Sequence, residues 1–167
     1  MARQLSFDLP VRPTLGREDF FVSPANAEAV AMIEGWQGWP SRKLILAGPA
    51  GAGKTHLTHV WAALSGGRII GSHDLPAADI PTLAQGPVAV EDAHLIAGDR
   101  TAEDALFHLH NLTLAEGHTL LVTARTAPHL WGLTLPDLAS RMQGTLLTEL
   151  RAPDDARAAD EAQCWSL

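Results

Sequence analysis

The sequence has few of the features that mark secreted, membrane-bound or DNA-binding proteins. Its 167 residues include one cysteine, Cys164, which excludes an internal disulfide and indicates a reducing compartment. No apolar stretch approaches the roughly 18 residues that a membrane span requires, and the N-terminus lacks the basic and then apolar pattern of a secretion signal. We therefore expect a cytoplasmic protein without membrane contact.

Basic residues are scarce as well. The chain has 12 Lys and Arg residues against 19 Asp and Glu residues, a formal net charge of −7, and the basic residues form no run. Because contacts to DNA phosphates need clustered Lys and Arg, we expect no direct DNA binding. Apolar residues, by contrast, make up 46% of the chain, which at this length predicts one globular domain with a core of its own.

One segment carries a phosphate-binding motif. Residues 48–55 fit the pattern G-x-x-x-x-G-K-[ST], in which glycines let backbone N–H groups turn toward phosphate oxygens. The helix that follows presents its positive dipole end to the same anion, Lys54 can reach the β- and γ-phosphates, and the Thr55 hydroxyl can hold Mg²⁺. The predicted ligand is a nucleoside triphosphate with Mg²⁺. The loop residues predicted to bind it are Gly48, Pro49, Ala50, Gly51, Ala52, Gly53, Lys54 and Thr55.

Short apolar runs alternate with helical patterns along the chain. Strands are expected at residues 43–47, 67–71, 87–92, 119–123 and 145–150. Helices are expected at residues 25–35, 55–65, 101–117 with Thr101 as the N-cap, and 136–144. This alternation predicts an α/β fold with a parallel sheet covered on both faces. Right-handed crossovers bring the carboxyl ends of the strands to one edge, where ligands bind.

Polar residues follow two of the predicted strands. Glu91 and Asp92 end an apolar run, the usual position of the acid that partners Mg²⁺ beside a phosphate loop. One of the two can hold the ion and the other can orient the attacking water. Thr123 ends the next strand and is a candidate for sensing the γ-phosphate. Two alternatives stay open. The acids could be solvated or cap a helix, and Thr123 could be an ordinary strand residue.

At these motifs the sequence resembles the AAA+ ATPases of the family that contains the bacterial replication initiator DnaA and its short homologue Hda. The resemblance spans roughly residues 4–153, and its motifs occur in the family's order; they are residues 19–26, 48–57, 88–94, 120–125 and 135–141. It implies a three-layer P-loop NTPase fold of the AAA+ type, with a five-stranded parallel sheet in the order 5-1-4-3-2. It implies ATP or ADP as the nucleotide, with Mg²⁺ held by Thr55, Glu91 and Asp92. It adds Phe21, Val22, Asn26 and His56 to the nucleotide-binding residues.

The resemblance also implies protein partners. Arg141 lies in the segment that carries the arginine finger of the family, a side chain that acts in trans on a neighbour's nucleotide, here the ATP of DnaA. The segment Gln4, Leu5, Ser6, Phe7, Asp8 and Leu9 resembles the peptide by which Hda-like proteins bind the DNA polymerase III sliding clamp. The alternatives are that Arg141 is a solvated helix residue or forms a local salt bridge, and that the N-terminal segment packs on its own domain. A homo-oligomer is a further option that the sequence leaves open.

The expected organisation is an extended segment at residues 1–16, a core at 17–153 and a short tail at 154–167. In the family a small helical lid follows the core, and the tail is too short to form one, so we expect the lid to be absent. Two functions stay open: an Hda-like regulator of replication initiation that stimulates ATP hydrolysis by DnaA, and a non-catalytic adaptor or helicase-loader-like ATPase. A small-molecule phosphoryl transferase is disfavoured because Arg68 and Arg125 form no paired cluster.

Overall fold

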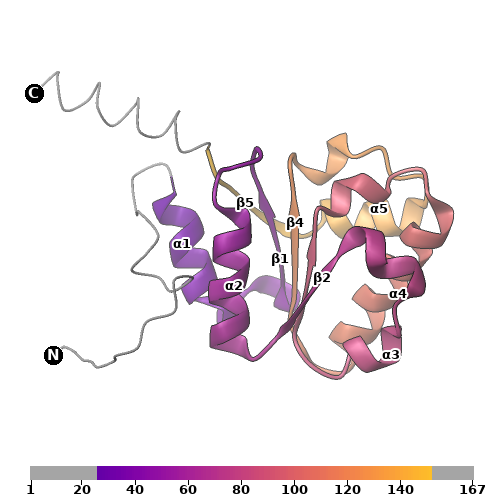
Figure 1. Ribbon diagram of the computed structural model, residues 1–167, viewed down its shortest axis with the longest axis horizontal. Helices are drawn as coiled ribbons and strands as arrows, with labels where there is room; N and C mark the ends of the chain where they lie inside the picture. Colours follow the sequence, from indigo (N-terminus) through magenta and orange to yellow (C-terminus); the bar gives the residue numbers. More distant parts are fainter. Residues whose placement is uncertain (1–25, 152–167) are drawn as a thin grey trace, which may run out of the picture.

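The computed structural model of the protein describes residues 26–151 (Figure 1). One sheet of five parallel strands lies at its centre, in the order β2-β3-β4-β1-β5. The strands are β1 (Lys43–Ala47), β2 (Arg68–Gly71), β3 (Val88–Glu91), β4 (Leu120–Ala124) and β5 (Leu146–Glu149). Counted from the other edge this is the order 5-1-4-3-2, so the predicted fold class and strand order are confirmed.

Four of the helices lie close to their predicted positions: α1 (Ala27–Glu34), α2 (Lys54–Ser65), α4 (Arg100–Ala115) and α5 (Pro136–Gln143). The short helix α3 (Ile80–Leu83) was not predicted, and short 3₁₀ turns occur between the other elements. The N-cap prediction for α4 is wrong: Asp99 caps the helix by accepting a hydrogen bond of 3.2 Å from the Ala102 amide. Its extended backbone aims the carboxylate at the first turn, so Thr101 falls inside the helix.

Helices cover both faces of the sheet, as Figure 1 shows: α1 and α2 lie on one side, and α3, α4 and α5 on the other. Strand β1 connects the two layers because successive side chains point to opposite faces. Leu44 and Leu46 pack among residues of α1 and α2, whereas Ile45 packs among residues of α4 and α5. All five residues of β1 are buried, as expected for a central parallel strand.

The parallel register brings the carboxyl ends of the strands to one edge. Ala47, the last residue of β1, is level with Ala124 of β4 and with Glu149 of β5. Glu91 of β3 is level with the last residue of β2. The loops that follow these strand ends therefore meet, and they carry the predicted site residues. Within residues 26–151 no helix combines the length and apolarity needed to cross a bilayer.

Candidate nucleotide-binding site

The predicted phosphate loop connects β1 to α2 in a conformation that depends on its glycines. Gly53, immediately before α2, has φ = 105°, a left-handed backbone conformation that residues other than glycine rarely adopt. At Gly48 the constraint is space: a Cβ atom there would lie 2.7 Å from the carbonyl oxygen of Leu150. The loop thus passes against the end of β5, and α2 begins directly behind it with its N-terminal N–H groups facing the loop.

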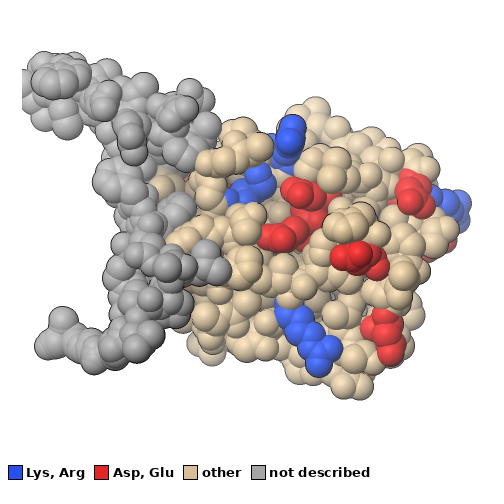
Figure 2. Space-filling model, in the orientation of Figure 1, with Lys and Arg blue, Asp and Glu red and all other residues tan. Residues whose placement is uncertain are grey.

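A cavity of about 390 Å³ lies beside this loop. It is lined by Ala50, Gly51, Gly53, Lys54, Thr55, Glu91, Asp92, Thr123 and Arg125. Its volume falls in the range of roughly 300–1,000 Å³ typical of small-molecule sites. In Figure 2, acidic and basic side chains lie side by side in the upper middle of the face shown, where the carboxyl ends of the strands meet in Figure 1. The structure therefore brings together around one cavity eight of the predicted site residues, from the phosphate loop and the ends of β3 and β4.

Lys54 is buried at the base of the cavity. Its Nζ atom donates hydrogen bonds to the carbonyl oxygens of Gly48 and, at 3.0 Å, Pro49. Burial lowers the pKa of Lys54; the nearby charge of Asp92 opposes this shift, and the charge of Arg125 adds to it. The ammonium is held by two neutral carbonyls, which are weaker acceptors than phosphate oxygens.

Glu91 lines the same cavity and has one unpaired carboxylate oxygen. Its Oε2 atom is buried and has no hydrogen-bond partner. Burial raises the pKa of Glu91, and the charge of Asp92 raises it further, while His59 and the Thr55 side chain lower it. A buried carboxylate oxygen without a donor, beside a threonine hydroxyl, is the donor set that Mg²⁺ prefers, so these residues fit the ion.

Asp92 and Thr123 are connected across two strands. The Thr123 hydroxyl, which is buried, accepts a hydrogen bond of 3.1 Å from the Asp92 amide. The Asp92 carbonyl accepts another of 2.8 Å from the hydroxyl of Ser72, which follows β2. Asp92 itself has φ = 60° and ψ = 46°, a left-handed conformation that aspartate tolerates better than most residues. The end of β3 is therefore fixed from both neighbouring strands, which sets the direction of the two acids.

Two residues near this cavity were not predicted as site residues. Arg125 follows the end of β4, lines the cavity, and lies close enough to Lys54 to lower its pKa. His94, three residues after Glu91, accepts a hydrogen bond of 3.3 Å at Nδ1 from the Arg125 amide. Burial lowers the pKa of His94 as well. The same signal that led to Glu91 and Thr123, a polar residue just after a strand, could have identified both.

The remaining predicted nucleotide-binding residues that the structure describes do not line this cavity. Gly48 and Pro49 line a second, smaller hollow of about 220 Å³, together with Arg125 and residues 149–151. Ala52 is buried in the core under α1 and α2. His56 lies half-buried in the first turn of α2, and Asn26 precedes α1. Phe21 and Val22, and the clamp-binding segment from Gln4 to Leu9, lie outside the described residues.

Arg141 is separated from the other predicted catalytic residues. Its side chain is exposed on α5 and does not line the cavity. Its carbonyl oxygen accepts a hydrogen bond of 3.2 Å from Nζ of Lys43, the first residue of β1. The phosphate loop begins after the last residue of that strand, about 13 Å away at the usual rise of a strand. The Arg141 backbone thus lies at the amino edge of the sheet, opposite the cavity.

Known structures share this fold. The replication initiator DnaA bound to AMPPCP and single-stranded DNA superimposes with a TM-score of 0.74 at 19% identity, covering 93% of this chain and 56% of that one. Domain III of DnaA from Thermotoga maritima gives a TM-score of 0.71 at 20% identity, covering 90% of this chain and 73% of the other.

The chain has a DnaA-like AAA+ fold. The structure of DnaI is also similar, with a TM-score of 0.63 and 16% identity. The match covers 81% of this chain and 89% of the DnaI chain. No protein-family model matches the sequence. The chain spans between 50 and 56% of the length of the first three DnaA and initiation-factor structures that it matches. At these identities the likeness shows the DnaA-like AAA+ fold, and the activity must be argued from the residues.

Proposed function

We propose that this DnaA-like AAA+ protein binds an adenine nucleotide with Mg²⁺ in the 390 Å³ cavity and regulates the initiation of DNA replication in the manner of Hda. The observation that carries nucleotide binding is the meeting of the phosphate loop, two strand-end acids and a buried threonine around one cavity. Two of the DnaA structures with this fold contain the ATP analogue AMPPCP, which supports an adenine nucleotide as the ligand.

Each cavity residue has a role that follows from its chemistry. The loop amides and Lys54 would bind the phosphates, since a phosphate oxygen is a stronger acceptor for Nζ than the carbonyls of Gly48 and Pro49. Thr55, Glu91 and Asp92 would hold Mg²⁺, which when bound neutralises phosphate charge. Arg125 would place a second positive charge beside the phosphates, and Thr123 holds the end of β3 in position.

Arg141 is suited to act on a different molecule. Its exposure on α5, at the edge of the sheet opposite the cavity, keeps it away from the nucleotide of its own chain. An arginine brought to a neighbour's γ-phosphate stabilises the charge of the transition state and raises rates by roughly 10³–10⁵ in GTPase systems. We assign this role toward ATP bound to DnaA. The Hda-like sequence of residues 4–9 supports the sliding clamp as the second partner.

The first test is nucleotide binding by the full chain, measured by isothermal titration calorimetry with ATP and with ADP in the presence of Mg²⁺. Lys54→Ala removes charged hydrogen bonds to phosphate and should weaken binding roughly 10- to 100-fold. Arg68→Ala, which removes an exposed arginine at the start of β2, should leave the affinity unchanged. Equal affinities for the two variants would contradict the assignment of the cavity.

The second test is the stimulation of ATP hydrolysis by purified DnaA, with the sliding clamp loaded on DNA. The wild-type protein should accelerate hydrolysis, and Arg141→Ala should abolish the acceleration while binding to the clamp survives. A version lacking residues 1–9 should lose clamp binding while its affinity for ADP stays unchanged. If Arg141→Ala still stimulates hydrolysis, a group other than Arg141 must be responsible for the acceleration.

A second candidate function is a nucleotide-binding adaptor or helicase-loader-like ATPase in a replication assembly. It is supported by the likeness of the fold to that of DnaI, with a TM-score of 0.63. The two functions differ in what they do to DnaA. Nucleotide and clamp binding without any change in the rate of hydrolysis by DnaA would select the adaptor.

A further inference from the structure

Helix α5, which carries Arg141, has little apolar contact to hold it in place. It is eight residues long, and two of its side chains, those of Leu138 and Met142, are buried. Isolated helices of this length are unstable in water, so the rest of the protein must hold it. Buried charged side chains from other elements form hydrogen bonds to the backbone at both ends of α5.

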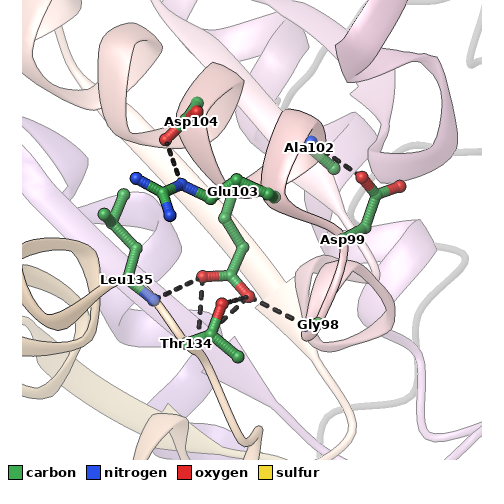
Figure 3. Close-up of polar contacts among 8 residues, drawn as sticks. Gly98, Asp99, Ala102, Glu103, Asp104, Thr134 and Leu135 are labelled. Carbon is green, nitrogen blue, oxygen red and sulfur yellow. Dashed lines mark hydrogen bonds and ion pairs between the residues drawn. The ribbon is translucent and has the colours of Figure 1, made fainter.

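The N-terminal end of α5 is bound by a buried acid from another helix. Glu103 of α4 has 0% of its surface exposed. Its carboxylate accepts hydrogen bonds from the amide of Leu135 at 2.7 Å, from the amide of Thr134 at 3.0 and 3.1 Å, and from the Thr134 hydroxyl at 3.1 Å (Figure 3). It also accepts one of 2.8 Å from the amide of Gly98. Leu135 is the residue that immediately precedes α5, so one side chain holds the start of this helix to α4.

The C-terminal end of α5 is bound by a buried base. Nζ of Lys43 donates a hydrogen bond of 3.2 Å to the carbonyl oxygen of Arg141 and lies 2.9 Å from Nε2 of His110. Arg141 provides one of the last four carbonyl groups of α5, which have no donor within the helix. The Thr145 hydroxyl donates to the same oxygen at 2.7 Å. Nδ1 of His110 lies 2.8 Å from the amide oxygen of Asn111, which fixes the ring.

The groups that bind the two ends of α5 are connected through α4. Glu103 and His110 are seven residues apart, two turns of α4, so they lie on the same face of that helix. The signs of the charges also match the dipole of α5, with an acid at its N-terminal end and a base at its C-terminal end. Within residues 26–151 neither Glu103 nor Lys43 lines the nucleotide cavity. These buried charges therefore act on α5 and have no place in phosphate binding.

We propose that Glu103 and the Lys43–His110 pair are positioning residues, which hold both ends of α5 and so fix where Arg141 is presented to a partner. The functional part of this inference rests on the proposed function of Arg141. Burying charge is not an efficient way to stabilise a fold, since apolar residues of similar volume often do as well or better. Hydrogen bonds are directional, however, and bonds at both ends prevent a helix from sliding or rotating on an apolar surface.

The test compares two pairs of variants in the full chain. Glu103→Gln turns one acceptor oxygen into a donor that faces the amides, and Asp104→Asn makes the same chemical change at the next residue, which is exposed. Lys43→Met keeps the stem but removes the ammonium, and Arg68→Met removes an exposed cation elsewhere. In Glu103→Gln and Lys43→Met, hydrogen exchange of the amides of residues 137–143 should accelerate roughly 10- to 100-fold relative to those of β1. The two control variants should exchange like the wild type.

The functional readout separates positioning from general damage. In the two test variants the maximum stimulated rate of hydrolysis by DnaA should fall about 10- to 100-fold, as for a misplaced catalytic group. The half-saturating concentration, and the affinity of this chain for ADP, should stay unchanged. Unchanged exchange in both test variants would overturn the inference, as would faster exchange with full stimulation.

Failure of the proposed function gives a different pattern. If the wild-type protein does not stimulate DnaA, that function is refuted, and the exchange of residues 137–143 alone decides whether these side chains position α5. If Arg141→Ala abolishes stimulation but Glu103→Gln and Lys43→Met do not reduce it, the function stands and the positioning role is refuted. Should Glu103→Gln fail to fold, Lys43→Met decides the matter at the other end of the helix.

Discussion

Changing Glu91 to glutamine should stabilise the metal-free protein and weaken its use of Mg²⁺. Oε2 of Glu91 is buried without a hydrogen-bond partner, and burial raises the pKa of this carboxyl. The charged form of Glu91 therefore lowers the free energy of unfolding. The replacement keeps the shape of the side chain and removes the charge, so it removes the cause of that cost.

The magnitude follows from what an unpaired buried group costs. An unsatisfied buried acceptor lowers stability by about 1–3 kcal/mol, and more if it is charged. Glutamine still leaves polar atoms buried, so we expect Glu91→Gln to gain about 1 kcal/mol in the free energy of unfolding at pH 7. For a chain of this size that corresponds to a rise of about 2–4 °C in Tm. Since the wild-type pKa is raised, the penalty is present above that pKa and disappears as the pH falls through it. The advantage of the variant should therefore shrink in acid.

The assay combines thermal unfolding without ligand and calorimetric titration of ATP in Mg²⁺ and in EDTA. Glu91→Gln should unfold at a higher temperature, bind ATP in EDTA at least as well as the wild type, and lose the gain that Mg²⁺ gives. Glu149→Gln is the matched control, because Glu149 ends β5 at the same sheet edge but is exposed and does not line the 390 Å³ cavity. A variant that is less stable than the wild type without ligand, or that keeps the full effect of Mg²⁺, would refute this reasoning.

Three further predictions test the loop, the missed arginine and the buried acid. Gly48→Ala should lose about 1–3 kcal/mol in the free energy of unfolding, measured in urea, because its Cβ would lie 2.7 Å from the carbonyl oxygen of Leu150. Gly86→Ala, where nothing lies within 4 Å, should not lose stability. Arg125→Ala should weaken ATP binding about tenfold in calorimetry, and an unchanged affinity would remove Arg125 from the site. Burial alone raises the pKa of Glu103, but its hydrogen bonds outweigh burial and hold the pKa below the ordinary value. Its contribution to stability is therefore complete above about pH 4.3 and lost as the pH falls through the native pKa, so the difference in unfolding free energy between the wild type and Glu103→Gln should narrow in acid.

The features that could be predicted from the sequence are those with local signals. The run from Lys43 to Ala47 is apolar, ends at a glycine and is followed by helical spacing, so strand, loop and helix could be placed to within a residue. The parallel sheet followed from the alternation of such units, while its strand order came from the resemblance to a family. Glu91 and Thr123 could be assigned to the site because strand ends meet at one edge in any sheet of this kind.

Features that depend on contacts between distant segments could not be predicted. Glu103 is an ordinary helix residue in the sequence, and its donors, at Thr134 and Leu135, lie 31 and 32 positions away. Lys43 likewise reaches a carbonyl 98 positions along the chain. The N-cap at Asp99 was missed for a local reason: both Asp99 and Thr101 are favourable caps, and the turn at the preceding glycine decides between them.

The buried charges in this protein serve two different tasks. At the carboxyl edge, Glu91 lines the cavity and has a buried carboxylate oxygen without a hydrogen-bond partner, a state that costs stability and that a bound cation would relieve. Away from the cavity, Glu103 has four donors and Lys43 has two neighbours, so these charges are already satisfied by the protein. Unsatisfied charge indicates where a ligand binds, and satisfied buried charge indicates what must stay in place. This distinction supports the two proposals, that the cavity binds a nucleotide and that α5 presents an arginine to a partner.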